Sequence, residues 1–333
     1  MRKKFRNYFL NYNADTLIKN NKLNISFNKV SYGSFGEKNK NKTFYVIKRS
    51  PGAGLFSNVI FVLNHLKIAN KHGFIPVVDM ENFPTIYNEN HKIKKIKNAW
   101  EYYFNSLNKY TLNEVYKSKN VIFTSSRFYE HMTHKIDNNK FNKFKKNIKI
   151  KREHYKISNN FYNRYIKGHK VLGIHLRGSS YKTSANHPSP PTFNQVKYKI
   201  NNLIKKEKFK KIFLCTEDKA YMDYMKKEFG NKILYFNTYR SYNDDAFKIY
   251  PRNNHRYNLG KEILIDTLIL MKCHTFLYTH TNVSTFVKFF SKKKIRYIEF
   301  KNGLNTSNEY YAKWQWKIKS RLPNLLGGFS HKI

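Results

Sequence analysis

A histidine and an arginine stand two residues apart at the end of an apolar run, in the segment GIHLRGS at 173–179. Strand side chains alternate between faces, so His175 and Arg177 would share one face. Arginine carries a planar, permanently charged fork that binds phosphate through two parallel hydrogen bonds. The alternative, pairing with a surface carboxylate, is less expected in a chain with only 21 acidic residues. The spacing therefore favours a phosphate site containing His175, Arg177 and Ser179.

Two further apolar runs end in residues of the kind that cap helices or hold nucleotides. Thr216 and Asp218 follow the run at 213–215. They either cap the next helix or hydrogen-bond a base or ribose, and residue chemistry alone leaves both open. The segment Asn282–Thr285 precedes a predicted helix, and its hydroxyls and helix N-terminus would form an anion cradle. Capping accounts for one of these polar residues but not for all.

The N-terminal half carries a glycine-rich turn, SPGAGLFSN at 50–58, directly after a predicted strand. Gly52 and Gly54 would let a ligand approach the backbone, or would only form a tight turn. The spacing fits neither the dinucleotide fingerprint nor a P-loop, so neither NAD nor a P-loop site is predicted. Asp79 and Glu81 follow the next predicted strand and are the nearby carboxylates.

The elements that position these residues form two strand–helix series. The first has strands at 44–48, 75–78 and 121–125. The second has strands at 171–176, 212–216, 233–236, 275–278 and 296–300, separated by helices at 190–206, 219–229, 262–272 and 284–290. We expect two Rossmann-like α/β domains with parallel sheets facing across a cleft, at 1–165 (with a polar leader at 1–42) and 166–333. Ligands of such sheets bind beyond the carboxyl ends of the strands.

Composition limits the functional classes. The chain has 333 residues and a formal net charge of +43, from 64 basic and 21 acidic residues. Such a surface fits solvated lysines, an anionic membrane or a charged acceptor; nucleic-acid binding would rest on charge alone and is not favoured. No apolar run approaches about 20 residues, and the N-terminus lacks a signal-peptide core. We therefore expect a cytoplasmic protein, either in the cytosol or peripheral on the cytosolic membrane face, with Cys215 and Cys273 buried and reduced. The absence of Asp-x-Asp leaves little material for a metal site.

Taken together, these motifs resemble the GDP-fucose-dependent fucosyltransferases of the protein O-fucosyltransferase and α1,6-fucosyltransferase superfamily. The resemblance covers 44–329 and rests on GLFSN at 54–58, GIHLR at 173–177, LCTED at 214–218 and NVST at 282–285. NAWEYYF at 98–104, His187-Pro188 and GKE at 260–262 with Asp266 resemble a bacterial branch. The resemblance implies a GT-B fold, GDP-fucose as donor, inversion at the anomeric carbon and no metal or other cofactor. The sequence departs from the pattern in three places: Gly178 replaces a second arginine of α1,6 members, their downstream acidic base has no match near Ala185, and His274 replaces an acid that contacts guanine in many relatives.

These observations lead to a predicted fucosyltransferase acting on a glycan or a lipid-linked or lipopolysaccharide acceptor. Arg177 would neutralise the leaving phosphate. Asn58 or Asp79, with Glu81 as another carboxylate, would serve the acceptor hydroxyl. The last helix would cross back to the first domain. The predicted donor-binding residues are Gly52, Gly54, His175, Arg177, Ser179, Thr216, Asp218, His274, Asn282, Val283, Ser284 and Thr285. A GT-B enzyme for another nucleotide sugar, such as an ADP-heptose or UDP-hexosamine, and a non-catalytic basic membrane- or nucleic-acid-binding protein stay open.

Overall fold

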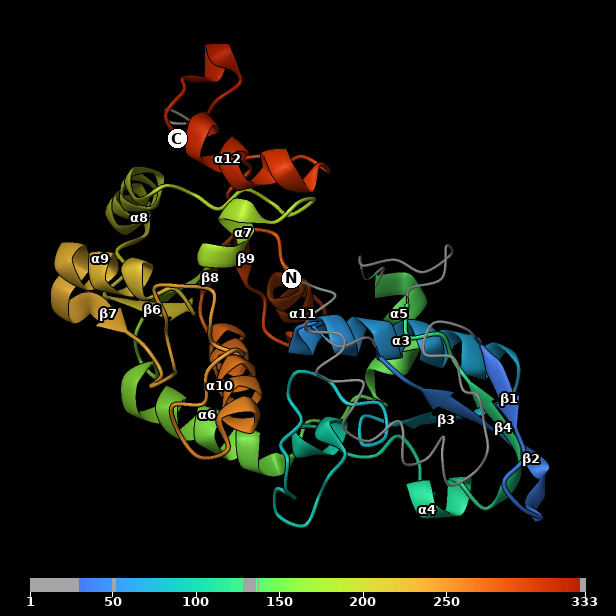
Figure 1. Ribbon diagram of the computed structural model, residues 1–333. Coiled ribbons are helices and arrows are strands. Elements are labelled where there is room, and N and C mark those ends of the chain that lie inside the picture. Colours follow the sequence, from blue (N-terminus) through green and yellow to red (C-terminus); the bar gives the residue numbers. More distant parts are fainter. Residues whose placement is uncertain (1–29, 50–51, 128–135, 137, 330–333) are drawn as a thin grey trace. The chain divides into compact units, whose positions relative to one another are not determined.

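The computed structural model describes residues 30–49, 52–127, 136 and 138–329 (Figure 1). Most of the predicted polar leader lies outside these residues. The chain divides into two compact units, 1–154 with 251–261 and 155–250 with 262–333. The first boundary falls inside helix α6 (Arg152–Tyr165), earlier than predicted, and a second falls inside helix α10 (His255–Leu270). Each unit is an α/β layer structure, as the sequence predicts.

The sheet of the first unit has the order β1-β4-β2-β3. Its strands are β1 (Ser31–Gly33), β2 (Lys38–Ile47), β3 (Ile75–Val78) and β4 (Ser118–Phe123). All neighbours are parallel except β1, a short antiparallel edge strand that the sequence did not reveal. Helix α3 (Leu55–Lys71) packs on one face, where the Tyr45 hydroxyl lies 2.9 Å from His65 Nδ1. The opposite face forms an aromatic-rich core with Phe83 and Val115.

Shorter helices complete the first unit: η1 (Ala99–Tyr102), α4 (Leu112–Val115) and α5 (Asn138–Lys145). The first residues of α10 also belong to it, although the sequence predicts that helix only from Glu262. Gly260 is the reason for the difference. A Cβ on this glycine would overlap the Tyr103 ring, so the glycine serves close packing inside the helix and does not end it.

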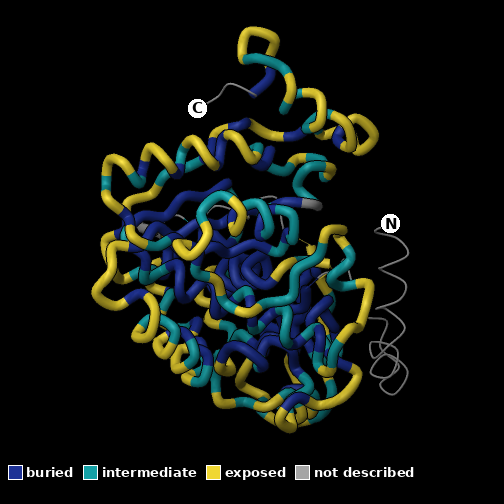
Figure 2. The backbone as a smooth tube through the Cα atoms, turned by 90° about the vertical axis from the view of Figure 1, so that its left-hand side faces the viewer, coloured by how far each residue is buried: buried dark blue, intermediate teal, exposed yellow. Residues whose placement is uncertain are grey.

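The sheet of the second unit is fully parallel, in the order β7-β6-β5-β8-β9. The strands are β5 (Val171–Leu176), β6 (Lys211–Thr216), β7 (Ile233–Leu234), β8 (Thr275–Tyr278) and β9 (Arg296–Glu299). Helices α8 (Phe193–Glu207) and α9 (Lys219–Phe229) build a core with one face of β5 and β6. Helix α10 covers the other face, because Gly173 lies against Leu270 and Cys273. Figure 2 shows the backbone coloured by burial, with buried residues toward the interior and exposed residues toward the outside.

The second unit also contains α7 (Ser179–Thr183), η2 (Gly230–Lys232), α11 (Asn282–Phe290), α12 (Glu309–Lys319) and η3 (Asn324–Leu326). The prediction that the last helix crosses back is wrong, since α12 belongs to the second unit and the returning segment is 251–261. Helix α12 is anchored within its own unit: Trp316 Nε1 donates to the Pro190 carbonyl at 2.7 Å, and Asn305 Nδ2 donates to the Ala312 carbonyl at 2.9 Å. Within the described residues no helix is long and apolar enough to span a membrane.

Candidate functional site

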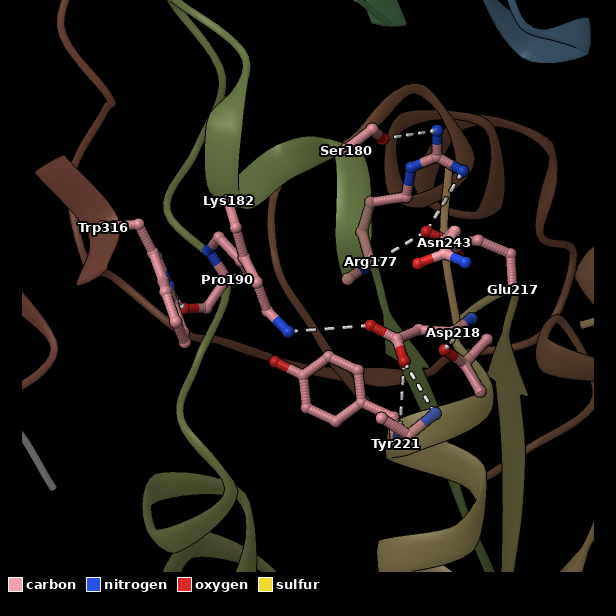
Figure 3. A network of polar contacts seen from close by, with 12 residues as sticks. Arg177, Ser180, Lys182, Pro190, Glu217, Asp218, Tyr221, Asn243 and Trp316 are labelled. Carbon is pink, nitrogen blue, oxygen red and sulfur yellow. Dashed lines mark hydrogen bonds and ion pairs between the residues drawn. The ribbon is translucent and has the colours of Figure 1, made fainter. Parts of the chain in front are cut away.

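Arg177 is the first residue beyond β5, whose six residues are all buried. Its side chain is 36% exposed, and its Nη1 lies 3.4 Å from Glu217 Oε1. Nη2 donates to Ser180 Oγ at 3.4 Å (Figure 3). The guanidinium lies over the Tyr181 ring. Glu217 Oε1 also accepts the Gly178 N–H at 3.1 Å. The carboxyl edge of the sheet therefore presents a permanent positive charge that is both oriented and accessible.

His175 lies on the same strand but is buried. Its Nδ1 is 3.4 Å from the Thr281 hydroxyl, which links β5 to the N-terminus of α11. Burial and the nearby charge of Arg177 lower the pKa of His175 to about 3. At neutral pH it is an uncharged hydrogen-bonding group, so it contributes position and not charge.

The N-terminus of α11 carries a capping box. Thr281 Oγ1 accepts the Ser284 N–H at 3.1 Å, and Ser284 Oγ accepts the Thr281 N–H at 2.9 Å. The Ser284 and Thr285 hydroxyls both donate to the Thr281 carbonyl. Local capping thus engages more of these hydroxyls than the sequence predicts. What remains for an anion is backbone: Asn282 and Val283 occupy the first turn, where N–H groups have no acceptor within the helix.

Thr216 and Asp218 take the capping role that the sequence left open. Thr216 Oγ1 accepts the Asp218 N–H at 3.1 Å, and Asp218 Oδ1 accepts the N–H of Ala220 at 2.8 Å to start α9. Asp218 Oδ2 lies 3.7 Å from Lys182 Nζ (Figure 3). A Cβ on Gly178 would overlap the Asp218 carboxylate. Position 178 has no room for a second arginine while Asp218 holds this place.

For two predicted donor-binding residues, Ser179 and His274, the structure shows no side chain at the carboxyl edge of the sheet. Ser179 begins α7, but its side chain lies outside the described residues. His274 precedes β8, and its Nδ1 accepts the Val171 N–H at 3.2 Å. Val171 is the first residue of β5, so His274 lies at the amino edge of the sheet, opposite His175 and Arg177. The sequence placed His274 with the donor site, and the parallel register contradicts that placement.

In the first unit, Gly52 has φ +90°, and Gly54 starts α3 without a side-chain cap. The Tyr87 hydroxyl supplies the missing acceptor, taking the Leu55 N–H at 2.9 Å. Asn58 is buried, and among the described residues its Oδ1 has no hydrogen-bond partner. The loop before α3 is further held by Arg49, whose Nη2 donates to Ser57 Oγ at 3.2 Å.

The predicted role of Asp79, a base that reaches the acceptor, does not fit the structure. The residue has no exposed surface, and both carboxylate oxygens anchor its own loop. Oδ1 accepts the N–H groups of Glu81 and Asn82, while Oδ2 accepts the Tyr116 hydroxyl at 2.6 Å. Burial raises its pKa, which these hydrogen bonds partly oppose. Glu81 is half-buried, and burial together with Asp79 raises its pKa as well, so it is the better placed of the two carboxylates.

Sequence reasoning named two acidic residues of the second unit in motifs without giving either a role, Glu217 and Asp266. Glu217 was noted in a motif but given no role, although it holds Arg177 and the Gly178 N–H. Asp266 lies on α10 beneath β6. Burial raises its pKa to about 8, and the charge of Glu262 adds to this effect. The charge of Arg240 and the hydrogen bond with Cys215 act in the opposite direction. The four-residue spacing of Glu262 and Asp266, one turn of a helix, was the available signal.

The part of the chain that the structure describes contains no cluster of three His, Cys, Asp or Glu residues able to hold a metal ion.

No family model matches the sequence, and no curated protein matches it. Solved structures do. The fucosyltransferase NodZ from Bradyrhizobium is 16% identical, with a TM-score of 0.52 over 79% of this chain and 98% of that chain.

A second NodZ structure, described as an alpha-1,6-fucosyltransferase soaked with GDP-fucose, is 15% identical with a TM-score of 0.52, over 78% of this chain and 95% of that chain. POFUT1 in complex with GDP-fucose matches less well, with a TM-score of 0.37 and 12% identity over 78% of this chain and 74% of that chain. Two α/β units with parallel sheets and nearly complete coverage of NodZ lead to one conclusion: the chain has the GT-B fold of that enzyme.

Proposed function

We propose that the chain is a metal-independent, inverting glycosyltransferase that takes fucose from GDP-fucose. The observation that carries the proposal is Arg177, oriented by Glu217 and accessible at the carboxyl edge of a parallel sheet. This is the edge where open α/β sheets bind nucleotides. The fold adds support, because it is shared with an enzyme whose structure was obtained with GDP-fucose.

The donor's diphosphate would lie between Arg177 and the first turn of α11. There the N–H groups of Asn282 and Val283, with the helix dipole, favour an anion. As the acceptor oxygen bonds to the anomeric carbon, the bond to the β-phosphate oxygen breaks and GDP departs. Arg177 would neutralise the charge that grows on that phosphate, the part a metal ion plays elsewhere. Neutral His175 would hold α11 in place through Thr281.

The acceptor hydroxyl must also lose a proton. We assign this role to Glu81 in preference to Asp79, because Glu81 keeps exposed surface whereas Asp79 has none, and a raised pKa suits a group that takes a proton. Asn58, also predicted at the acceptor, is buried like Asp79, so we assign it no contact with the acceptor. We expect the acceptor to be a glycan or a lipid-linked sugar, reached from the cytoplasmic side.

The experiment compares Arg177→Ala and Arg177→Lys with Arg296→Lys, a matched control on the amino end of β9 that pairs with Glu207. GDP release from GDP-fucose needs no acceptor and is followed by mass spectrometry, while GDP affinity is measured by calorimetry against ADP and UDP. Losing one such donor lowers the rate by about 10²–10³. Arg177→Lys keeps the charge but loses the fork, so it also falls well below the control.

Near-normal turnover of folded Arg177→Ala would show that Arg177 does not stabilise the leaving phosphate. Tighter binding of ADP or UDP than of GDP would show that the donor is another nucleotide sugar, without affecting the assignment of the fold. The same assay in EDTA tests metal independence: full activity is expected, whereas loss on chelation and recovery with Mn²⁺ would contradict it.

A further inference from the structure

Helix α12 has an apolar face that the described part of the chain leaves exposed. Its inner face is packed: Ala312 is buried, the Trp316 indole N–H donates to the Pro190 carbonyl, and the Trp316 ring lies near Phe329. The opposite face carries large exposed side chains at helical spacing, with Trp314 53% and Tyr310 68% exposed. We call this face the aromatic stripe; it consists of Tyr310, Tyr311, Trp314 and Ile318.

A second exposed apolar feature follows the helix. The turn η3 presents Leu325, which is 98% exposed, and Leu326, which is 67% exposed. The turn is firmly built, because the Phe329 N–H donates to the Lys319 carbonyl at 2.9 Å and Gln195 Nε2 donates to the Phe329 carbonyl at 3.0 Å. The turn therefore presents two leucines to water, an exposed apolar surface of the kind that marks contact sites. We call these two residues the leucine turn.

Basic residues border the apolar surface. Lys313 and Lys317 lie one turn apart on the flank of the aromatic stripe, and Arg321 follows the helix. The Lys317 ammonium lies over the Trp314 ring, 5.6 Å from its centroid. Glu309, in the first turn, is the one acidic residue of α12. An apolar face with tryptophan and tyrosine, flanked by cations, is the composition of helices that lie in a membrane interface.

We propose that the aromatic stripe and the leucine turn insert into the headgroup region of an anionic membrane. The aliphatic side chains decide between lipid and nucleic acid, because Leu325, Leu326 and Ile318 find a favourable environment among acyl chains and none along a phosphate backbone. The net charge of +43 and the flanking lysines oppose contact with a second copy and favour anionic lipid. This inference locates the membrane contact and does not depend on which donor the enzyme uses.

The test uses the full chain without nucleotide or acceptor, so failure of the donor assignment leaves it intact. Binding to vesicles of phosphatidylglycerol in phosphatidylcholine is measured by co-sedimentation, with pure phosphatidylcholine as reference. Trp314→Ser/Leu325→Ser should weaken binding about tenfold or more, given the apolar area removed. Tyr32→Ser, at an aromatic on β1 that is even more exposed than Trp314, should bind like wild type.

Two double variants that remove the same charge distinguish the lysines beside the aromatic stripe from lysines elsewhere on the surface. Each basic residue near an anionic membrane contributes roughly 1 kcal/mol, a factor of about five. Lys313→Gln/Lys317→Gln should therefore lose over tenfold, and more than Lys205→Gln/Lys206→Gln, two exposed lysines at the end of α8. The inference fails if wild type ignores anionic vesicles at low salt, if Trp314→Ser/Leu325→Ser binds normally, or if both lysine pairs lose equally. Circular dichroism confirms that each variant is folded.

Discussion

Gly178 shows how a single missing side chain sets the local geometry of the proposed donor site. Its N–H is held by Glu217, and the space where a Cβ would stand is filled by Asp218. Asp218 is itself fixed, since its carboxylate caps α9 and pairs with Lys182. The identity of residue 178 is therefore tied to residue 218, which lies between the neighbouring strand β6 and helix α9.

This coupling can be measured. Gly178→Ala should destabilise the protein by about 1–3 kcal/mol, because the added methyl forces neighbours to shift. Asp218→Gly removes the obstructing side chain. As a replacement of the helix cap by glycine, it should lower the free energy of unfolding by only about a few tenths of a kcal/mol. In the double variant the penalty of Gly178→Ala should largely disappear. Urea unfolding of the four proteins gives the coupling energy, and strictly additive penalties would show that the overlap is relieved elsewhere.

At the scale of elements, helix N-termini at the carboxyl edge have similar caps but different surroundings. Both α8 and α11 begin with a capping box, Thr192 with Gln195 and Thr281 with Ser284. The Gln195 side chain is bound to Asn302, in the C-terminal part of the chain, whereas Thr281 contacts His175 beside Arg177. The same local motif thus supports packing in one helix and the proposed phosphate site in the other.

Replacing each threonine by alanine separates these roles. Thr192→Ala and Thr281→Ala should each cost about 1 kcal/mol of stability, the usual worth of an N-cap. Only Thr281→Ala should also weaken GDP binding, by several fold, because the first turn of α11 and His175 lose a shared anchor. Urea unfolding and GDP calorimetry on both variants supply the data. Equal GDP affinities in the two variants would show that the N-terminus of α11 takes no part in GDP binding.

The sequence was sufficient for elements with strong periodicity and insufficient for features made by distant contacts. Strands 171–176 and 275–278 and helix 219–229 have the predicted bounds, since apolar runs and a glycine stop define them locally. The early part of α10 was missed because Gly260 looks like a helix end until Tyr103 is known to pack on it. The three-residue strand β1 has too few residues to show a period.

The candidate site divides in the same way. Arg177 could be proposed from residue chemistry and strand position alone. The burial of Asp79 could not, because it depends on Tyr116 and Asn82, which are brought to it by the loop and by α4. His274 was misplaced because a motif gives an order of residues but not the edge of the sheet on which each falls.

At the scale of the molecule, two buried groups of the second unit give stability opposite dependences on pH. His175 has a pKa of about 3 in the fold against 6.5 in the unfolded chain, so its contribution is present above 6.5 and lost as pH falls. Asp266 has a pKa of about 8 against 3.8, so its contribution is present below 3.8 and lost as pH rises. Between pH 3.8 and 6.5 the folded state holds the Asp266 proton and the unfolded state holds the His175 proton. The two slopes therefore cancel there.

Above pH 6.5 only the Asp266 slope remains, so this residue should lower the free energy of unfolding by up to about 2 kcal/mol between pH 6.5 and 8. Asp266→Asn should abolish that decline and uncover a stability that rises with pH from 4 to 6.5. His175→Asn should instead show a steady fall from pH 4 to 8. Urea unfolding of the three proteins across this range tests the cancellation. If Asp266→Asn declines above pH 6.5 as steeply as wild type, Asp266 is ionised in the fold and its charge is balanced by Arg240.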